Sequence, residues 1–149
     1  MKFRHEWKHE INLSDCIILR QRLGAVMQQD EHAENGKYEV RSLYFDNLYD
    51  KVLSEKINGV KQREKFRLRL YNGDDSFISL EKKLKTGSLT NKQSNIITAE
   101  EAYQLSQGRY EGIEPGERAI LFELIEKMKT QGLMPKTLVD YTREAFVYP

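Results

Sequence analysis

Apolar and polar side chains alternate along several stretches of the chain, which is the pattern of β-strands with one packed face and one polar face. In segment 63–71, Lys65, Arg67 and Arg69 occupy alternate positions, and the apolar Phe66, Leu68 and Leu70 alternate with them. Asn72-Gly73 separates this segment from another alternating segment, 76–85, and such a turn between alternating runs predicts a β-hairpin. The same pattern predicts further strands at 2–11, 38–46, 92–97 and 136–147.

A three-to-four-residue spacing of apolar positions, together with capping signals, predicts three or four helices between these strands. Ser14 is the expected N-cap of the first helix, Thr98 and Glu101 fit a capping box, and Pro115 suits the first position of the last helix. The predicted ranges are 15–29, 47–57, 98–107 and 115–132. The first helix is expected to turn inward Ile18, Leu19, Leu23, Val26 and Met27, and the last one Ile120, Leu121, Leu124, Ile125 and Met128.

The central strands are consecutive and joined by hairpins, so the predicted class is α+β with a mostly antiparallel sheet of about six strands. We expect a single domain over residues 1–149. The sequence ends at Pro149 directly after a strand with a patterned ionic face, and nothing follows to cover that edge. We therefore expect a domain that lacks its C-terminal strands.

Composition narrows the class of partner. The 149 residues include 24 Lys and Arg and 23 Asp and Glu, for a net charge of +1, which argues against a generally basic nucleic-acid binder. The lone Cys16 excludes an internal disulfide framework and a Cys-rich zinc site. No apolar run of membrane-spanning length and no signal peptide is present, so we expect a cytoplasmic protein.

The charges are sorted along the sequence. Residues 61–92 contain nine Lys and Arg against four Asp and Glu, whereas the remainder contains 15 against 19. On an open sheet this ionic face would be ordinary solvated surface. On a sheet curled into a barrel it would line the interior and require a polyanion, and the planar fork of Arg suits phosphate. Interspersed carboxylates such as Glu6 and Glu81 would orient the bases or hold a divalent metal.

Five segments resemble a known family. They are RHEWKHEI (4–11), VRSLYFDN (40–47), REKFRLRLYNGDDS (63–76), LEKKLKTGSLTNK (80–92) and PKTLVDYTREAFVYP (135–149). Together they resemble the VTC domain, the polyphosphate polymerase branch of the triphosphate tunnel metalloenzymes, which are related to the CYTH proteins. The resemblance implies an eight-stranded antiparallel tunnel, of which about six strands are present here. It also implies binding of a triphosphate or polyphosphate with Mn²⁺ or Mg²⁺.

The resemblance also implies roles for individual residues. The catalytic phosphate clamps would be Arg67, Arg69, Lys83 and Arg143. Further phosphate-binding candidates are Lys8, Lys85, Lys92, Lys136 and Tyr141. Glu6 and Glu81 are the candidate metal ligands, although Arg4 replaces the first Glu of the Glu-x-Glu-x-Lys opening common in the superfamily. The principal metal-binding Glu of the family is expected beyond Pro149.

For an intact domain, the resemblance implies transfer of the γ-phosphoryl group of ATP to a growing polyphosphate. The alternatives are a triphosphate hydrolase, or a non-catalytic polyphosphate- or nucleotide-binding module, which truncation would favour. The expected partners are ATP, polyphosphate or tripolyphosphate. Few aromatic side chains share the cationic face of the hairpin, so no nucleic acid is expected. Strand exchange in a homodimer is one way in which an incomplete tunnel could close.

Overall fold

The computed structural model describes residues 2–149 and contains helices and strands in an α+β arrangement, as predicted. The helices are α1 (Leu13–Val26), α2 (Lys51–Ile57), α3 (Ala99–Ser106) and α4 (Ala119–Gln131). The long strands are β3 (Tyr38–Asp46), β4 (Gln62–Tyr71), β5 (Asp74–Thr86), β6 (Leu89–Ile97) and β7 (Met134–Arg143). The short strands are β1 (Arg4–His5), β2 (Gln28–Gln29) and β8 (Phe146–Val147).

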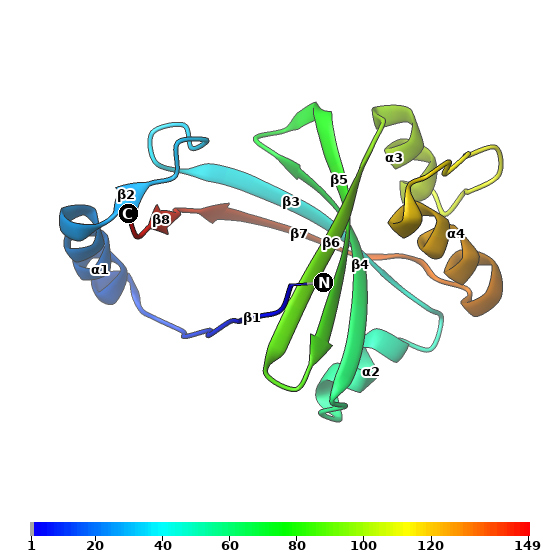
Figure 1. The fold of residues 1–149 in the computed structure, drawn as a ribbon, viewed down its shortest axis with the longest axis horizontal. Helices are drawn as coiled ribbons and strands as arrows, with labels where there is room; N and C mark the ends of the chain where they lie inside the picture. The colour runs from blue at the N-terminus through cyan, green and yellow to red at the C-terminus, as the bar shows by residue number, and fades with distance from the viewer. Residues whose placement is uncertain (1) are drawn as a thin grey trace.

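Six strands form one antiparallel sheet in the order β1-β6-β5-β4-β3-β7, and β2 pairs with β8 in a separate ladder. Figure 1 shows the two long strands β3 and β7 running from the sheet toward α1, β2 and β8. The hairpins β4–β5 and β5–β6 place Lys65 opposite Lys83 and Lys83 opposite Lys92. Their side chains therefore share one face of the sheet.

The opposite face of the sheet carries the hydrophobic core, which α3 and α4 cover (Figure 1). Phe66 and Leu68 of β4 are buried there, so the apolar face predicted for this strand is confirmed. The stripe predicted for the last helix is confirmed as well, because all five residues are buried. We call the face without α3 and α4 the inner face of the sheet.

Side-chain caps fix where the two core helices begin. Thr98 and Glu101 form the predicted capping box of α3. The last helix begins at Ala119 rather than at Pro115. Asn95, on β6, accepts hydrogen bonds from the amides of Ile120 and Leu121 at 2.8 and 3.1 Å. A residue distant in sequence thus satisfies donors at the start of α4.

The N-terminal predictions are wrong in two respects. The strand expected over 2–11 pairs only at Arg4–His5, and Trp7 is 82% exposed rather than packed. The first helix has no buried residue, so its expected inward-facing stripe does not contribute to the core. The physical reason is its position: α1 lies apart from the sheet (Figure 1).

The strand predicted over 136–147 is divided. Pairing with β3 ends at Arg143, and Phe146–Val147 pairs instead with Gln28–Gln29. The division brings Glu144 to Arg20 of α1, with contacts of 2.8 and 2.6 Å.

Among the helices of residues 2–149, none combines the length and the apolar character that a membrane-spanning helix needs.

Candidate functional site

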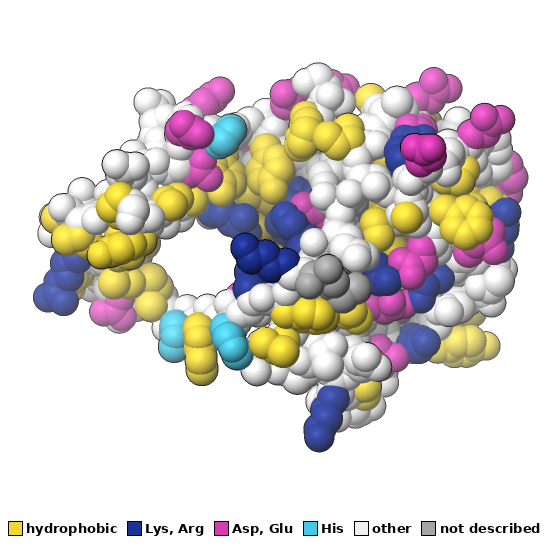
Figure 2. Space-filling view, in the orientation of Figure 1, with side chains coloured by type: hydrophobic (Ala, Val, Ile, Leu, Met, Phe, Trp, Pro, Cys, Tyr) yellow, Lys and Arg dark blue, Asp and Glu magenta, His cyan; other side chains and the backbone are white. Residues whose placement is uncertain are grey.

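Cations gather on the inner face of the sheet. Figure 2 shows a hollow through the molecule, with Lys and Arg side chains on the wall next to the sheet. Within β4, alternation sends Arg63, Lys65, Arg67 and Arg69 to this face because Phe66 and Leu68 occupy the core face. The strand order places β3 and β5 directly beside β4, with β7 and β6 beyond them, so side chains of these four strands also lie on this face.

The centre of this face is an ion pair between two neighbouring strands. Arg67 Nε donates to Glu81 Oε2 at 2.6 Å, and the Glu81 side chain is only 3% exposed. Arg67 Nη1 also donates to the Tyr44 hydroxyl at 3.1 Å. Burial acts to raise the pKa of the Glu81 carboxyl, but the charge and hydrogen bond of Arg67, together with the charges of Lys92 and Arg69, hold this pKa below its usual value. Glu81 therefore remains an anion that fixes Arg67.

A second group of contacts extends this centre toward β7. Arg69 donates to Ser42 Oγ at 2.8 Å and to the Tyr141 hydroxyl at 3.0 Å, and Arg143 donates to the same hydroxyl at 2.8 Å. Arg69 also lies 4.0 Å from Glu81. We call Arg67, Arg69 and Arg143, with Glu81 and Tyr141, the arginine cluster. The cluster contains three guanidinium groups and one carboxylate, which leaves positive charge for an anion.

Beside the arginine cluster lies a cavity of about 410 Å³. It collects cations from two strands, the N-terminal segment and α2. We call it the lysine pocket, and its cations are Lys8, Lys56, Arg63, Lys65, Lys83 and Lys85. Its one carboxylate is Glu6, which accepts a 2.7 Å hydrogen bond from Lys83 and lies 3.9 Å from Lys8.

The electrostatic imbalance of the lysine pocket acts on Lys65. Burial, followed by the charges of Lys56, Arg63, Lys8 and Lys83, lowers the pKa of Lys65 to about 8. The pKa of Glu6 is lowered as well, chiefly because the hydrogen bond from Lys83 stabilises the carboxylate anion. The pocket thus holds more positive charge than its own carboxylate neutralises.

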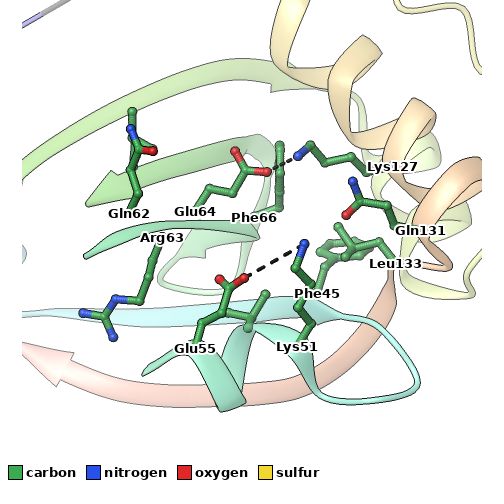
Figure 3. A pocket seen from close by; sticks show the side chains of 12 residues that line it. Phe45, Lys51, Glu55, Gln62, Arg63, Glu64, Phe66, Lys127, Gln131 and Leu133 are labelled. Carbon is green, nitrogen blue, oxygen red and sulfur yellow. Dashed lines mark hydrogen bonds and ion pairs between the residues drawn. The ribbon is translucent and has the colours of Figure 1, made fainter. Parts of the chain in front are cut away.

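A cavity on the core side of the sheet provides a contrast. It measures about 360 Å³ and lies between α2, β4 and α4 (Figure 3). Both of its carboxylates are paired with cations of the lining: Glu64 contacts Lys127, and Glu55 lies 4.0 Å from Lys51. Arg63 lines this cavity as well as the lysine pocket, so three cations here face two carboxylates, compared with six cations and one carboxylate in the lysine pocket. The smaller excess of positive charge makes this cavity less suited to a polyanion.

Comparison with known proteins identifies the family. The model of the VTC domain family matches residues 3–149. The chain belongs to the VTC domain family. No curated protein matches it significantly. The predicted family is therefore confirmed.

Among solved structures, the VTC domain described here is similar to the crystal structure of a "putative adenylate cyclase" from Bacillus halodurans. The TM-score is 0.57 and the sequence identity is 12%, over 99% of this chain and 65% of that chain. The chain thus spans less than two thirds of the length of that protein. At this identity the similarity shows the fold and no more.

The predicted site residues of the VTC domain separate into groups. Arg67, Arg69, Tyr141 and Arg143 come together in the arginine cluster. Lys8, Lys83 and Lys85 line the lysine pocket. Lys92 lies between the two groups, because it stands opposite Lys83 and 3.5 Å from Glu81. Lys136 lies apart from both groups and pairs with Asp50 at 3.2 Å.

The two candidate metal ligands do not come together. Glu81 is paired with Arg67, and Glu6 is paired with Lys83. No group of three or more His, Cys, Asp or Glu side chains in the described part of the chain could hold a metal ion. The carboxylates of residues 2–149 therefore do not fit a divalent metal by themselves, and instead each anchors a cation.

Several residues of the inner face escaped the sequence prediction. The sequence predicts that Tyr44 packs in the core or against the sheet. In the structure its hydroxyl accepts a hydrogen bond from Arg67, and the Arg67 guanidinium lies 5.9 Å from the centre of its ring. Lys56 reaches the lysine pocket from α2, which no strand pattern indicates. Alternation had already placed Lys65 on this face with Arg67 and Arg69. Extending the alternation of β3 and β4 along the full length of each strand adds Ser42 and Arg63.

Proposed function

We propose that this VTC domain binds the phosphate chain of ATP and of inorganic polyphosphate along the inner face, and that it transfers the γ-phosphoryl group of ATP to the polyphosphate. The observation that carries the proposal is the arginine cluster, in which Arg69 and Arg143 donate to one tyrosine hydroxyl while Arg67 is held by Glu81. Membership of the VTC domain family supports the same ligand class.

The chemistry asks mainly for positioning and charge stabilisation. In the proposed reaction, a terminal phosphate oxygen of the polyphosphate attacks the γ-phosphorus of ATP. The bond from that phosphorus to the bridging oxygen breaks, ADP leaves with the electron pair, and the polyphosphate gains one phosphate. Arg67, Arg69 and Arg143 would hold the phosphates in line and offset the charge on their oxygens. No step is assigned to a metal ion, because the described carboxylates do not form a site for one.

A non-catalytic polyphosphate-binding module is the second candidate. The observation that favours it is the pairing of both Glu6 and Glu81 with cations, which leaves the described inner face suited to binding an anion. A triphosphate hydrolase would use the same contacts, with water as the acceptor.

Binding of tripolyphosphate, measured by isothermal titration calorimetry, tests the proposal. Arg143→Ala is the appropriate variant, because Arg67→Ala would strand the buried Glu81 carboxylate. Arg143 makes its hydrogen bond to a neutral hydroxyl, so its removal leaves no unpaired charge. We expect binding to weaken by about tenfold or more, since a charge-assisted contact is lost. Arg41→Ala is the matched control, because Arg41 pairs with Asp140 at 2.8 Å and both side chains are more than half exposed.

The products then separate the candidates. The chain is incubated with ATP and a polyphosphate primer in the presence of Mn²⁺ or Mg²⁺, and chain length and free phosphate are both measured. Longer polyphosphate supports the polymerase, free phosphate alone supports the hydrolase, and binding without turnover supports the binding module. Absence of tripolyphosphate binding, or equal binding by Arg143→Ala, would contradict all three.

A further inference from the structure

The short helix α2 turns apolar side chains toward solvent. Its half-buried residues, Val52 and Glu55, line the cavity on the core side of the sheet. Leu53 and Ile57 are four residues apart and therefore lie on one side of the helix, and both are exposed, Ile57 by 74%. Large apolar side chains that gather on a surface indicate a place that another molecule covers.

The exposed apolar surface continues into the chain on both sides of α2. Its members are Leu48, Tyr49, Leu53, Ile57 and Val60, and we call this group the α2 tip. Figure 1 shows α2 projecting at one end of the molecule, beside the sheet. Backbone hydrogen bonds hold the tip in place, because the Val60 amide donates to the Glu55 carbonyl at 3.1 Å.

The charges around the α2 tip are mainly positive. Residues 48–63 contain four Lys and Arg against two Asp and Glu. Both of these carboxylates already lie within 4.0 Å of a lysine. Lys56 and Lys61 are exposed, so their charges are available to an anionic partner. The tip thus combines an apolar centre with cations at its border, which is the arrangement of surfaces that bind anionic bilayers.

The size and position of the α2 tip favour a lipid surface over a protein. A stable protein interface takes about 20–30 residues from each partner, whereas the tip offers five apolar side chains. Leu53 and Ile57 line neither of the two cavities beside α2, so they do not form the wall of a groove for a peptide. A projecting apolar tip can enter a bilayer without a complementary surface, and lysines beside it attract anionic head groups.

We propose that the α2 tip is a membrane-docking surface, whose apolar side chains enter the interface of an anionic phospholipid bilayer while Lys56 and Lys61 contact the head groups. The helix lies on the bilayer and does not cross it, because its seven residues are far too few for a span. This surface is separate from the arginine cluster and does not depend on the proposed function. Lys56 also lines the lysine pocket, so docking brings that pocket close to the bilayer.

Co-sedimentation with lipid vesicles tests the proposal. Vesicles of phosphatidylcholine with about one third phosphatidylserine supply the anionic surface, and vesicles of phosphatidylcholine alone are the neutral comparison. We expect the wild type to bind the anionic vesicles and to bind the neutral ones much more weakly. The cations of the inner face could also attract anionic lipid, so the assay is repeated with excess tripolyphosphate, which should leave vesicle binding in place.

Substitutions in the tip provide the decisive comparison. Leu53→Ser combined with Ile57→Ser should weaken binding to anionic vesicles about tenfold or more, because two apolar side chains no longer enter the bilayer. Both positions are exposed, so circular dichroism should show an unchanged fold. Phe122→Ser, at an exposed position of α4, is the matched control and should bind as the wild type does. Lys61→Glu should weaken binding about fivefold or more.

Fluorescence measures whether the tip enters the bilayer. Trp7 is the single tryptophan of the chain, so Trp7→Phe combined with Leu53→Trp places the sole tryptophan in the tip. Brominated acyl chains in the anionic vesicles should quench its emission. Phe122→Trp in the same Trp7→Phe background is the control and should not be quenched.

The other outcomes would contradict the proposal. Equal binding by the wild type and by the Leu53→Ser, Ile57→Ser variant, or no binding of anionic vesicles by the wild type, would show that the tip does not dock on lipid. Loss of vesicle binding in tripolyphosphate would assign the lipid contact to the inner face. A smaller oligomer in the double variant, with vesicle binding retained, would assign the tip to a second copy of the chain. Tripolyphosphate binding by calorimetry tests the proposed function independently of all these results.

Discussion

Glu81 is the residue on which the arginine cluster depends. Its carboxylate contacts Arg67 at 2.6 Å, Lys92 at 3.5 Å and Arg69 at 4.0 Å, so one buried anion serves three cations from the two neighbouring strands β4 and β6. Without a ligand these cations would repel one another, and a buried carboxylate without them would be strongly unfavourable. Glu81 is therefore best described as a positioning residue that holds the cations in place before a polyanion arrives.

Lys65 illustrates the opposite situation, in which a cation has no dedicated anion. Burial and neighbouring cations lower its pKa to about 8, so the folded protein binds this proton less tightly than the unfolded chain. The penalty is fully present below pH 8 and disappears as the pH rises toward 10.5, where the unfolded lysine also loses its proton. We expect Lys65→Met to increase the free energy of unfolding at pH 7 by about 1 kcal/mol, after allowance for solvent screening.

Thermal denaturation followed by circular dichroism measures this effect. An increase of about 1 kcal/mol corresponds to a Tm higher by about 2–4 °C for a chain of this size. The difference between Lys65→Met and the wild type should shrink as the pH is raised from 7 toward 10. Lys65→Arg is the control, because its charge persists and its Tm should show no such recovery. A Tm for Lys65→Met below that of the wild type at pH 7 would contradict the prediction.

At the level of elements, alternation predicted the central sheet well. The range 38–46 is reproduced by β3, and the division of β4 into an apolar and a cationic face is confirmed by the burial of Phe66 and Leu68. These features depend on local periodicity, which the sequence displays directly. The expected gathering of Arg67, Arg69 and Arg143 follows from the same alternation combined with the family resemblance.

Features that depend on distant contacts could not be predicted in this way. The start of α4 is set by Asn95, which lies 25 residues before Ile120. The exposure of α1 and of Trp7 depends on where the chain places them relative to the sheet, and an apolar spacing does not encode that position. The separation of the site into an arginine cluster and a lysine pocket likewise depends on the register of β4 and β5 and on the position of α2.

The contribution of the capping box of α3 to the stability of the protein should depend on pH. Glu101 closes the capping box and accepts hydrogen bonds from Arg118 at 2.8 and 2.7 Å. The hydrogen bond from Arg118 is the main reason that the pKa of Glu101 is lowered to about 2. Its contribution is therefore present above about pH 4.5 and is lost as the pH falls through about 2. We expect Glu101→Gln to reduce the free energy of unfolding at pH 7 by about 1–2 kcal/mol.

Urea denaturation at pH 7 and at pH 3 measures that contribution. The difference between the wild type and Glu101→Gln should be smaller at pH 3 than at pH 7. Glu100→Gln is the matched control, since Glu100 lies in the same first turn and is exposed. A loss of stability in Glu100→Gln as large as in Glu101→Gln would show that helix charge in general, rather than the Arg118 contact, determines the effect.

For the molecule as a whole, the hollow beside the inner face is bordered on one side by the sheet and on the other by α1 (Figures 1 and 2). α1 has no buried residue, and an isolated helix of this length is marginal in water. Among its contacts with the rest of the fold, Arg20 of α1 donates two hydrogen bonds to the Glu144 carboxylate. Lys37 lies 3.6 Å from the same carboxylate. The carboxylate of Glu144, directly after β7, thus helps to hold the wall of the hollow opposite the sheet, together with the pairing of β2 and β8.

We expect Glu144→Ala to loosen α1 selectively. Amide hydrogen exchange over residues 13–26 should accelerate several-fold, because loss of the contacts with Arg20 makes local opening of this helix more frequent. Exchange in the core strands β4 and β5 should be unchanged, since their protection comes from the sheet. Hydrogen exchange followed by mass spectrometry resolves the two regions in one experiment.

Asp140→Ala is the matched control for this change, because the Arg41–Asp140 pair is also made through two contacts and lies on the same strand, but does not touch α1. Equal acceleration of α1 in both variants would mean that general weakening of β7, rather than the Glu144 tie, loosens the helix. Unchanged exchange in Glu144→Ala would mean that other contacts hold α1 in place. Faster exchange in α1 alone would instead show that α1 can move while the cationic strands β4 and β5 stay fixed. The width of the hollow would then be determined independently of the charges on the sheet.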